Sequence, residues 1–219
     1  MDPFRLVVAL SPLAIYFIAF GLINLSRRPR LLDGPRDTLA LGAALAGLML
    51  VGPAELWMPE GLLARLGSHA WAAWLAWITF YAVLVLLAAL VQLPRITIYN
   101  IRPAELRRIL GQIAPTLDPD ARLIGDTLVL PRLAVQLHVD SSPMMRSATL
   151  SAIGHHQSYE GWRILKQTLR AELARTVVKA NPLGLFLALS GASIAIVLVV
   201  RSIIDPQAIA QSVTEALRL

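Results

Sequence analysis

Apolar residues occur along the chain in four long runs, and a segment of mixed polarity separates the third run from the fourth. A helix needs about 20 apolar residues to cross the hydrocarbon core of a bilayer. The second run is the weakest, because Pro53 and Glu55 lie near its end, where the last carbonyls can meet water. The pattern predicts four membrane spans, at residues 4–25, 39–58, 71–93 and 183–204.

The periodicity changes at Pro94, where the third run ends. The stretch "RITIYNI" is rich in β-branched residues and predicts a strand. "RPAELRRILGQIAPTL" repeats apolar residues at three and four positions, which predicts an amphipathic helix. After it we expect a strand, a turn at Gly125 and Asp126, a half-buried strand at 132–139 and a further strand in "RSATLSAI". "SYEGWRILKQTLRAELARTVVK" predicts a second long helix.

These elements predict a small α+β domain at residues 94–180, in the order β-α-β-β-β-α. An antiparallel sheet with both helices on one face is the economical packing for that order. The sequence "NPLG" then opens the last span within residues 181–204, with Asn181 as its expected N-cap. The fold class is therefore a multi-pass α-helical membrane protein, with four spans and the α+β domain inserted between the third and the fourth.

The two ends of the chain are predicted from the same pattern. The region 1–93 holds the first three spans, and its first apolar run lacks a small-residue cleavage site, so we expect it to stay as a span. At the other end, Asp205 and Pro206 form a helix start signal. Residues 205–219 predict an external amphipathic helical tail, which could lie on the membrane, pack on a partner or prolong the fourth span.

Basic residues predict the orientation, because cytoplasmic connections carry an excess of Lys and Arg. The first connection has four arginines, the second has only Arg65, and residues 95–179 have 12 basic residues. This places 16 basic residues on one side and 4 on the other. We therefore expect both termini outside and residues 94–180 in the cytoplasm.

Composition agrees with a membrane protein, because 56% of the 219 residues are hydrophobic and only 16% are charged. The mean hydropathy is +0.62. The strong preference for Arg over Lys suggests a GC-rich genome, and hence the cytoplasmic (inner) membrane of a bacterium. The chain has no Cys, which excludes disulfides, thiolate metal sites and Cys nucleophiles.

Small residues recur at four-residue spacing in two of the predicted spans. Such spacing lets helices approach closely and is typical of helix–helix interfaces. It occurs also by chance in an Ala-rich chain, and the partner could be the same bundle or another membrane protein. The helix-packing candidates are Gly42 and Ala46 in the second span and Gly184, Ala188 and Ala192 in the fourth.

The predicted cytoplasmic side is basic, with a net charge of +5 over residues 95–179. Anionic lipid headgroups are the nearest negative charge, and each well-placed basic residue contributes about 1 kcal/mol. An acidic protein partner is the alternative. We do not expect nucleic acid as a partner, because the chain lacks the alternation of basic and aromatic residues that is typical of nucleic-acid-binding modules. The lipid-headgroup candidates are Arg27, Arg28 and Arg30 in the first connection and Arg163, Lys166 and Arg170 on the last helix of the domain.

No pattern predicts a catalytic residue, a cofactor or a metal site. His138, His155 and His156 with Asp126 or Asp140 could in principle ligate a metal, but their spacing matches no metal motif. There is no Walker A sequence and no glycine-rich dinucleotide fingerprint. The acids of "LDPDARLIGD" are explained by turns and caps rather than by a Ca²⁺ loop. Enzymatic activity is left open, and we lean against it.

The leading hypothesis is a non-enzymatic membrane scaffold or accessory subunit, whose cytoplasmic domain docks a partner or organises a membrane complex. The partner could be another membrane protein, a cytoplasmic protein or a second copy of the chain. One alternative is a channel or transporter subunit without a charged coupling site, because no ionisable residue lies near the centre of a predicted span. The other is a membrane enzyme at the lipid interface, for which His138, His155 and nearby acids should converge in a cleft.

Overall fold

The computed structural model of the chain describes residues 3–57, 69–154, 157–204, 206–207 and 210. The chain divides into two compact units. One, which we call the helical unit, comprises Met1–Phe20, Thr38–Leu90 and Phe186–Leu219. The other, which we call the sheet domain, comprises Gly21–Asp37 and Val91–Leu185, so it includes the first connection as well as the long insert.

Three helices of the described chain are long and apolar enough to cross a membrane. They are α1 (Pro3–Leu25), α4 (Ala70–Leu90) and α7 (Pro182–Ile204). Their apolar stretches are Phe4–Leu25, Trp71–Leu90 and Pro182–Ile204, in agreement with the first, third and fourth predicted spans. The third ends three residues earlier than expected, before Pro94. The length and composition of these three helices are compatible with a membrane protein.

The second predicted span coincides with α2 (Gly34–Trp57), which is not among these three helices. This helix begins at Gly34 rather than Leu39, so its first turns include Arg36 and Asp37. Charged first turns and four glycines make it less apolar than α1, α4 and α7. Passage of α2 through the membrane therefore stays a prediction. The expected tail helix falls almost wholly outside the described residues.

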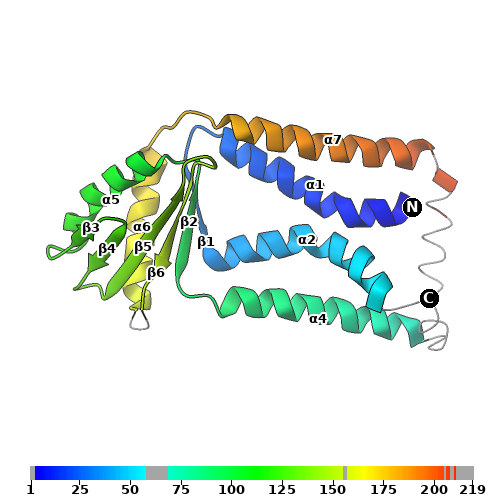
Figure 1. The fold of residues 1–219 in the computed structure, drawn as a ribbon, viewed down its shortest axis with the longest axis horizontal. Coiled ribbons are helices and arrows are strands. Elements are labelled where there is room, and N and C mark those ends of the chain that lie inside the picture. The colour runs from blue at the N-terminus through cyan, green and yellow to red at the C-terminus, as the bar shows by residue number, and fades with distance from the viewer. Residues whose placement is uncertain (1–2, 58–68, 155–156, 205, 208–209, 211–219) are drawn as a thin grey trace. The chain divides into compact units, whose positions relative to one another are not determined.

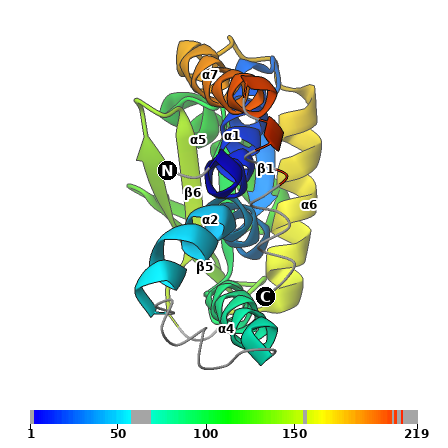
Figure 2. The same cartoon turned by 90° about the vertical axis from the view of Figure 1, so that its right-hand side faces the viewer.

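Glycines mark the points of closest contact within the helical unit. A Cβ on Gly47 of α2 would lie 2.1 Å from the Val8 carbonyl oxygen of α1. A Cβ on Gly191 of α7 would lie 2.8 Å from the Ala14 carbonyl oxygen, also of α1. The helices therefore follow one another as α7, α1, α2 and α4, which both views show (Figure 1, Figure 2).

Two aromatic side chains of α4 join it to α2. Trp77 Nε1 donates a hydrogen bond to the Met49 carbonyl oxygen at 3.2 Å, and the Tyr81 hydroxyl donates to the Gly42 carbonyl oxygen at 2.7 Å. The donors are four residues apart and therefore lie on the same face of α4. In an apolar surrounding such bonds fix both the rotation and the position of α4 along α2.

The sheet domain is built on one antiparallel sheet in the order β1-β2-β6-β5-β4-β3. The order along the chain is β1, β2, α5, β3, β4, β5, β6 and α6. The strands are β1 (Arg30–Asp33), β2 (Arg95–Tyr99), β3 (Arg122–Ile124), β4 (Thr127–Leu130), β5 (Val135–Ser142) and β6 (Ser147–Ala152). The helices are α5 (Pro103–Leu117) and α6 (Tyr159–Arg175).

The sheet has six strands, whereas the sequence predicted four. One addition is β1, which comes from the first connection and pairs with β2, Leu32 standing opposite Thr97. Four residues flanked by Pro29 and Gly34 give no periodic signal, so only the pairing reveals this strand. The other addition follows from a turn after β4, where Pro131 lacks an N–H and Ala134 has a positive φ of 48°. The strand expected at 132–139 therefore begins at Val135 instead.

Both helices pack on one face of this sheet. Alternate residues of β4, β5 and β6 are buried in the same core as the inward sides of α5 and α6. Gln136, His138 and Asp140, on the opposite face of β5, are exposed. The fully buried side chains of this core are Ile98, Ile101, Leu106, Leu110, Leu128, Leu130, Val135, Leu137, Leu150, Leu165, Leu169 and Leu173.

Candidate functional site

Acidic residues fix the first connection to the rest of the sheet domain. Asp37 accepts a hydrogen bond from the Tyr99 hydroxyl at 2.7 Å and lies 3.7 Å from Arg95 Nη2. Asp33, the last residue of β1, pairs with Lys166 of α6 at 2.8 Å. Figure 2 shows α6 running beside β1. The first connection is therefore a structural part of the domain and not a loop outside it.

Buried asparagines join the end of α1, the segment after β2 and the segment before α7. The Asn181 N–H donates to the Asn24 carbonyl oxygen at 2.9 Å, and Asn100 Nδ2 donates to the Ser26 carbonyl oxygen at 2.6 Å. Asn24, Asn100 and Asn181 are each at most 2% exposed. The Asn181 side chain also accepts from the Leu183 N–H at 3.2 Å, which confirms its role as the cap of α7.

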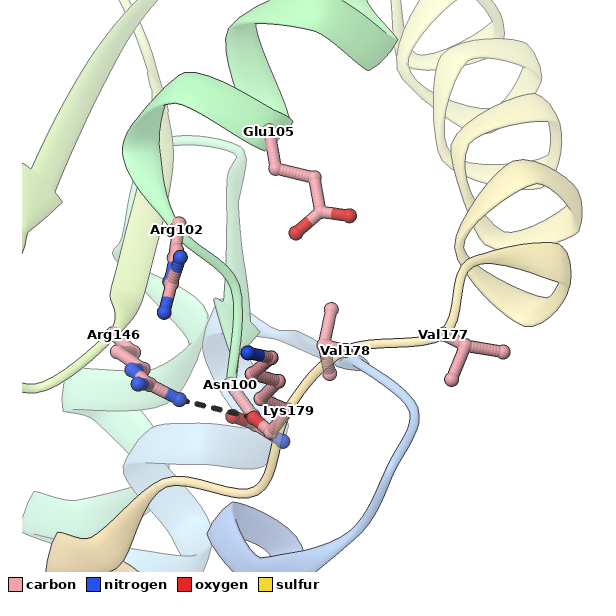
Figure 3. Close-up of a pocket in the computed structure, with 7 residues that line it drawn as sticks. All are labelled: Asn100, Arg102, Glu105, Arg146, Val177, Val178 and Lys179. Atoms are coloured by element: carbon pink, nitrogen blue, oxygen red, sulfur yellow. Dashed lines mark hydrogen bonds between the residues drawn. The ribbon is translucent and has the colours of Figure 1, made fainter.

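Beside this junction lies a pocket of about 150 Å³. Its wall is made by the segment between β2 and α5, by the turn between β5 and β6, and by the linker that follows α6. Glu105 points into it from α5, whereas the side chain of Val177 points away (Figure 3). The lining residues are Asn100, Arg102, Glu105, Arg146, Val177, Val178 and Lys179.

The pocket contains three cationic side chains and one carboxylate. Among the described residues, none of Arg102, Arg146 and Lys179 has a carboxylate within 4 Å. Arg146 is held in place, because its Nη1 donates to the carbonyl oxygens of Lys179 at 3.0 Å and Ala180 at 3.1 Å (Figure 3). The site is thus a fixed guanidinium flanked by two exposed cations.

The wall of the pocket also holds a polar atom without a partner. Asn100 has a positive φ of 58°, its Nδ2 is committed to Ser26, and its Oδ1 is buried with no hydrogen-bond partner among the described residues. A buried acceptor of this kind costs free energy until a donor reaches it. The pocket therefore combines cations with the Glu105 carboxylate, and one of its lining residues, Asn100, holds a buried acceptor without a partner.

The lipid-headgroup candidates lie on two segments, the first connection and α6, and two of them are paired with acids. Lys166 is paired with Asp33, and Arg163 is paired with Glu160. The hydrogen bond to Glu160 raises the pKa of Arg163 above its ordinary value. Arg27, Arg28, Arg30 and Arg170 are exposed. None of the six lines the pocket.

Two of the five helix-packing candidates lie at close contacts. A Cβ on Gly42 would lie 2.4 Å from Val85 Cγ1 of α4, and a Cβ on Gly184 would lie 2.7 Å from the Gly21 carbonyl oxygen of α1. Ala46, Ala188 and Ala192 are half-buried. Gly47 and Gly191, which make the contacts of α2 and α7 with α1, were not among the candidates. The spacing of seven between Gly184 and Gly191 is the signal that would have identified the second of them.

The residues considered for catalysis or metal binding form no metal-binding group among the described residues, and one of them, Asp118, serves the fold. No group of three His, Cys, Asp or Glu that could hold a metal occurs in the described part of the chain. His138 lies on the exposed face of β5, while His155 and His156 are outside the described residues. Asp118 accepts hydrogen bonds from the backbone N–H groups of Asp120 and Arg132, which is the capping role expected for this stretch.

The pocket residues were not singled out from the sequence, because they come from three separate segments. Arg102 precedes a helix, Arg146 lies in a turn, and Lys179 follows a helix, so no spacing connects them. The sequence contains only a weak signal for the pocket: all three are basic residues at the ends of predicted elements. Their meeting depends on the β5–β6 turn reaching the segment before α7.

Comparisons of the chain with models of known protein families, with curated proteins and with solved structures found no match.

Proposed function

We propose that the protein is a non-enzymatic scaffold or accessory subunit of the bacterial cytoplasmic membrane. In this proposal the sheet domain lies in the cytoplasm and docks a partner protein or organises a membrane complex. One observation supports it above the others: the sheet takes strands from two separate connections, so that the domain is continuous in the chain with α1, α2, α4 and α7. A domain with four such attachments suits a docking platform better than a domain on a flexible tether.

The contacts at these attachments support the same proposal. Tyr99 and Arg95 hold Asp37 at the start of α2, while the Asn181 N–H donates to the carbonyl oxygen of Asn24 in the last turn of α1. Buried polar contacts of this type favour one arrangement of the chain over others. In this proposal the segments of the sheet domain keep one arrangement, so a partner would bind a surface of fixed shape.

The proposed orientation has a direct test with reporters fused to the full chain. A reporter after Leu219 should be active in the periplasm, and one inserted in the β5–β6 turn next to Pro143 should be active in the cytoplasm. The basic first connection, which forms β1, requires both connections to lie on the same side. Periplasmic activity of the reporter at Pro143 would overturn the cytoplasmic assignment.

The docking proposal is tested by photo-crosslinking in native membranes. We would place the crosslinking amino acid at Gln136 on the exposed face of β5, or at Arg170 on α6, and compare both with Leu87 of α4, whose exposed side chain suits lipid. The account expects one adduct of defined mass from a domain position and none of that mass from Leu87. The same adduct from Leu87, or solute flux through the reconstituted protein, would contradict the scaffold proposal, whereas adducts of the chain only with itself would identify a second copy as the partner.

A further inference from the structure

We propose that the pocket formed by Arg102, Arg146 and Lys179 binds the headgroup of a membrane phospholipid, with the phosphate on the three cations. The inference does not depend on partner docking. It depends on α1 and α7 being membrane spans, whose length and composition are described above.

The first step is the charge of the pocket and the donors it offers. Three cations face one carboxylate, and no described carboxylate pairs with the cations. Arg146 uses Nη1 for two carbonyl oxygens, and its guanidinium is thereby fixed at the pocket wall. A guanidinium held in this way loses little conformational freedom when it binds an oxyanion, and phosphate accepts its parallel N–H groups well. A volume of about 150 Å³ admits a group of the size of a phosphate ester.

The second step is the unpartnered Asn100 Oδ1, which a bare anion cannot satisfy. Asn100 is 1% exposed, and its Nδ2 bond to Ser26 fixes which atom of the amide is the free acceptor. Glu105 adds a second acceptor, and its side chain points into the pocket (Figure 3). Two acceptors beside three cations suit a ligand that carries both a phosphate and a hydrogen-bond donor. Phosphoglycerol and phosphoethanolamine headgroups have this chemistry, whereas phosphocholine has no donor.

The third step is the place of the pocket residues in the chain, close to the points where α1 ends and α7 begins. Lys179 lies three residues before Pro182, where α7 begins, and the Val178 N–H donates to the carbonyl oxygen of Arg27, two residues after α1 ends. If the apolar stretches of α1 and α7 occupy the hydrocarbon core, residues just beyond their ends lie at the level of the headgroups. This position favours a lipid over a free phosphate ester.

Exposed apolar side chains next to the cations also favour a lipid as the source of the phosphate. Met144 and Met145, at the tip of the β5–β6 turn, are 76% and 54% exposed, and Val177 is 72% exposed. Asn181 Nδ2 donates to the Met145 carbonyl oxygen at 3.3 Å, which ties this tip to the start of α7. Apolar side chains beside basic ones are typical of surfaces that rest on the boundary between headgroups and acyl chains.

The test is native mass spectrometry of the full chain in a nonionic detergent, titrated with phosphatidylglycerol, phosphatidylethanolamine, phosphatidylcholine or glycerol 3-phosphate. The double variant Arg102→Gln/Lys179→Gln removes two exposed cations of the pocket. The matched control Arg108→Gln/Arg122→Gln removes two exposed cations elsewhere in the sheet domain. We expect one phosphatidylglycerol or phosphatidylethanolamine per chain, with an affinity about tenfold lower in the pocket variant and unchanged in the control, a difference of about 1.4 kcal/mol.

The other outcomes overturn the proposal in distinct ways. Equal weakening in the pocket variant and its control would mean that general electrostatics, and not the pocket, retains the lipid. Binding of glycerol 3-phosphate as tight as that of phosphatidylglycerol would identify a site for a soluble phosphate ester. Retention of no lipid by the wild-type chain would remove the site altogether.

A single variant tests the role of the acceptors separately. Glu105→Gln removes negative charge from the pocket, so a site for phosphate alone should bind every phosphate ligand more tightly. If the carboxylate accepts a hydrogen bond from the headgroup, the same variant should instead reduce the preference for phosphatidylethanolamine over phosphatidylcholine. An unchanged preference would contradict the assignment of Glu105 as an acceptor for the headgroup.

Discussion

The helical unit exposes large apolar side chains on its surface, whereas the sheet domain buries them in its core. Leu87 of α4 is 50% exposed and Phe186 of α7 is 68% exposed, whereas Leu137 of β5 and Leu165 of α6 are fully buried. In the sheet domain apolar area is removed from water, which is the main force that stabilises a soluble core. Outward-facing leucines in the helical unit would contribute no hydrophobic stabilisation in water, and they suit contact with lipid.

Polar groups differ between the two regions in the same sense. The sheet domain uses ion pairs, such as Lys166 with Asp33 and Arg107 with Asp126. In the helical unit, Trp77 and Tyr81 donate to backbone carbonyl oxygens, and glycines bring the helices together. Without a hydrophobic force between helices in lipid, close packing and a few hydrogen bonds must determine how they associate. The comparison predicts that equivalent substitutions have unequal effects in the two regions.

The largest difference is expected for truncation of a leucine. Leu137→Ala leaves a cavity in the sheet domain and should reduce the free energy of unfolding by about 2–5 kcal/mol. Leu87→Ala, on an exposed face of α4, should change it by about 0.5 kcal/mol or less. Thermal unfolding of the full chain in detergent, followed by hydrogen exchange of the β5 amides, measures both. Equal effects would mean that the side chain of Leu87 packs in a core.

Loss of a buried carboxylate should have the next largest effect. Asp118 is fully buried, and its two oxygens accept hydrogen bonds from the N–H groups of Asp120 at 2.9 Å and Arg132 at 2.7 Å. Asp118→Ala leaves both donors unsatisfied and should cost about 3 kcal/mol. Asp120→Ala removes only an exposed ion pair with Arg132 and should cost less than about 1 kcal/mol. Urea unfolding of the two variants would show whether this ranking holds.

A methyl group at a helix contact should destabilise the helical unit. Gly47→Ala would force α1 and α2 apart, because its Cβ would meet the Val8 and Ala9 carbonyl groups, and overpacking of this kind costs about 1–3 kcal/mol. Gly52→Ala in the same helix meets nothing within 4 Å and should be neutral or stabilising by up to about 1 kcal/mol. Midpoints of thermal unfolding in detergent distinguish the two, and a harmless Gly47→Ala would refute the α1–α2 contact.

The smallest effect concerns the attachment of α2 to the sheet. Tyr99→Phe removes the hydrogen bond to Asp37 and should cost about 1 kcal/mol, with the Arg95 contact retained. The local readout is faster hydrogen exchange of the amides at 36–39 while those of β5 are unchanged. Equal acceleration in both places would indicate that the hydroxyl stabilises the whole domain rather than this attachment.

Much of this architecture follows from periodicity, and the rest depends on pairing between distant segments. The apolar runs predicted α1, α4 and α7, and the spacing of Leu106, Ile109, Leu110 and Ile113 predicted the buried side of α5. In contrast, β1 has four residues and becomes a strand only because β2 offers it a free edge. The pocket is equally non-local, since Arg102, Arg146 and Lys179 meet through the turn and linker that join different elements.

The central claim is that the first connection forms β1 of the sheet domain, and paired cysteines test it most directly. The natural chain has no Cys, so Leu32→Cys/Thr97→Cys introduces the only possible disulfide, across a register pair of β1 and β2. Residues opposite each other in an antiparallel pair lie within the separation that a disulfide requires. Oxidation in native membranes should form this bond, and Leu32→Cys/Ile98→Cys, with side chains on opposite faces, should not form one. Equal crosslinking of both pairs, or none in the first, would contradict the account.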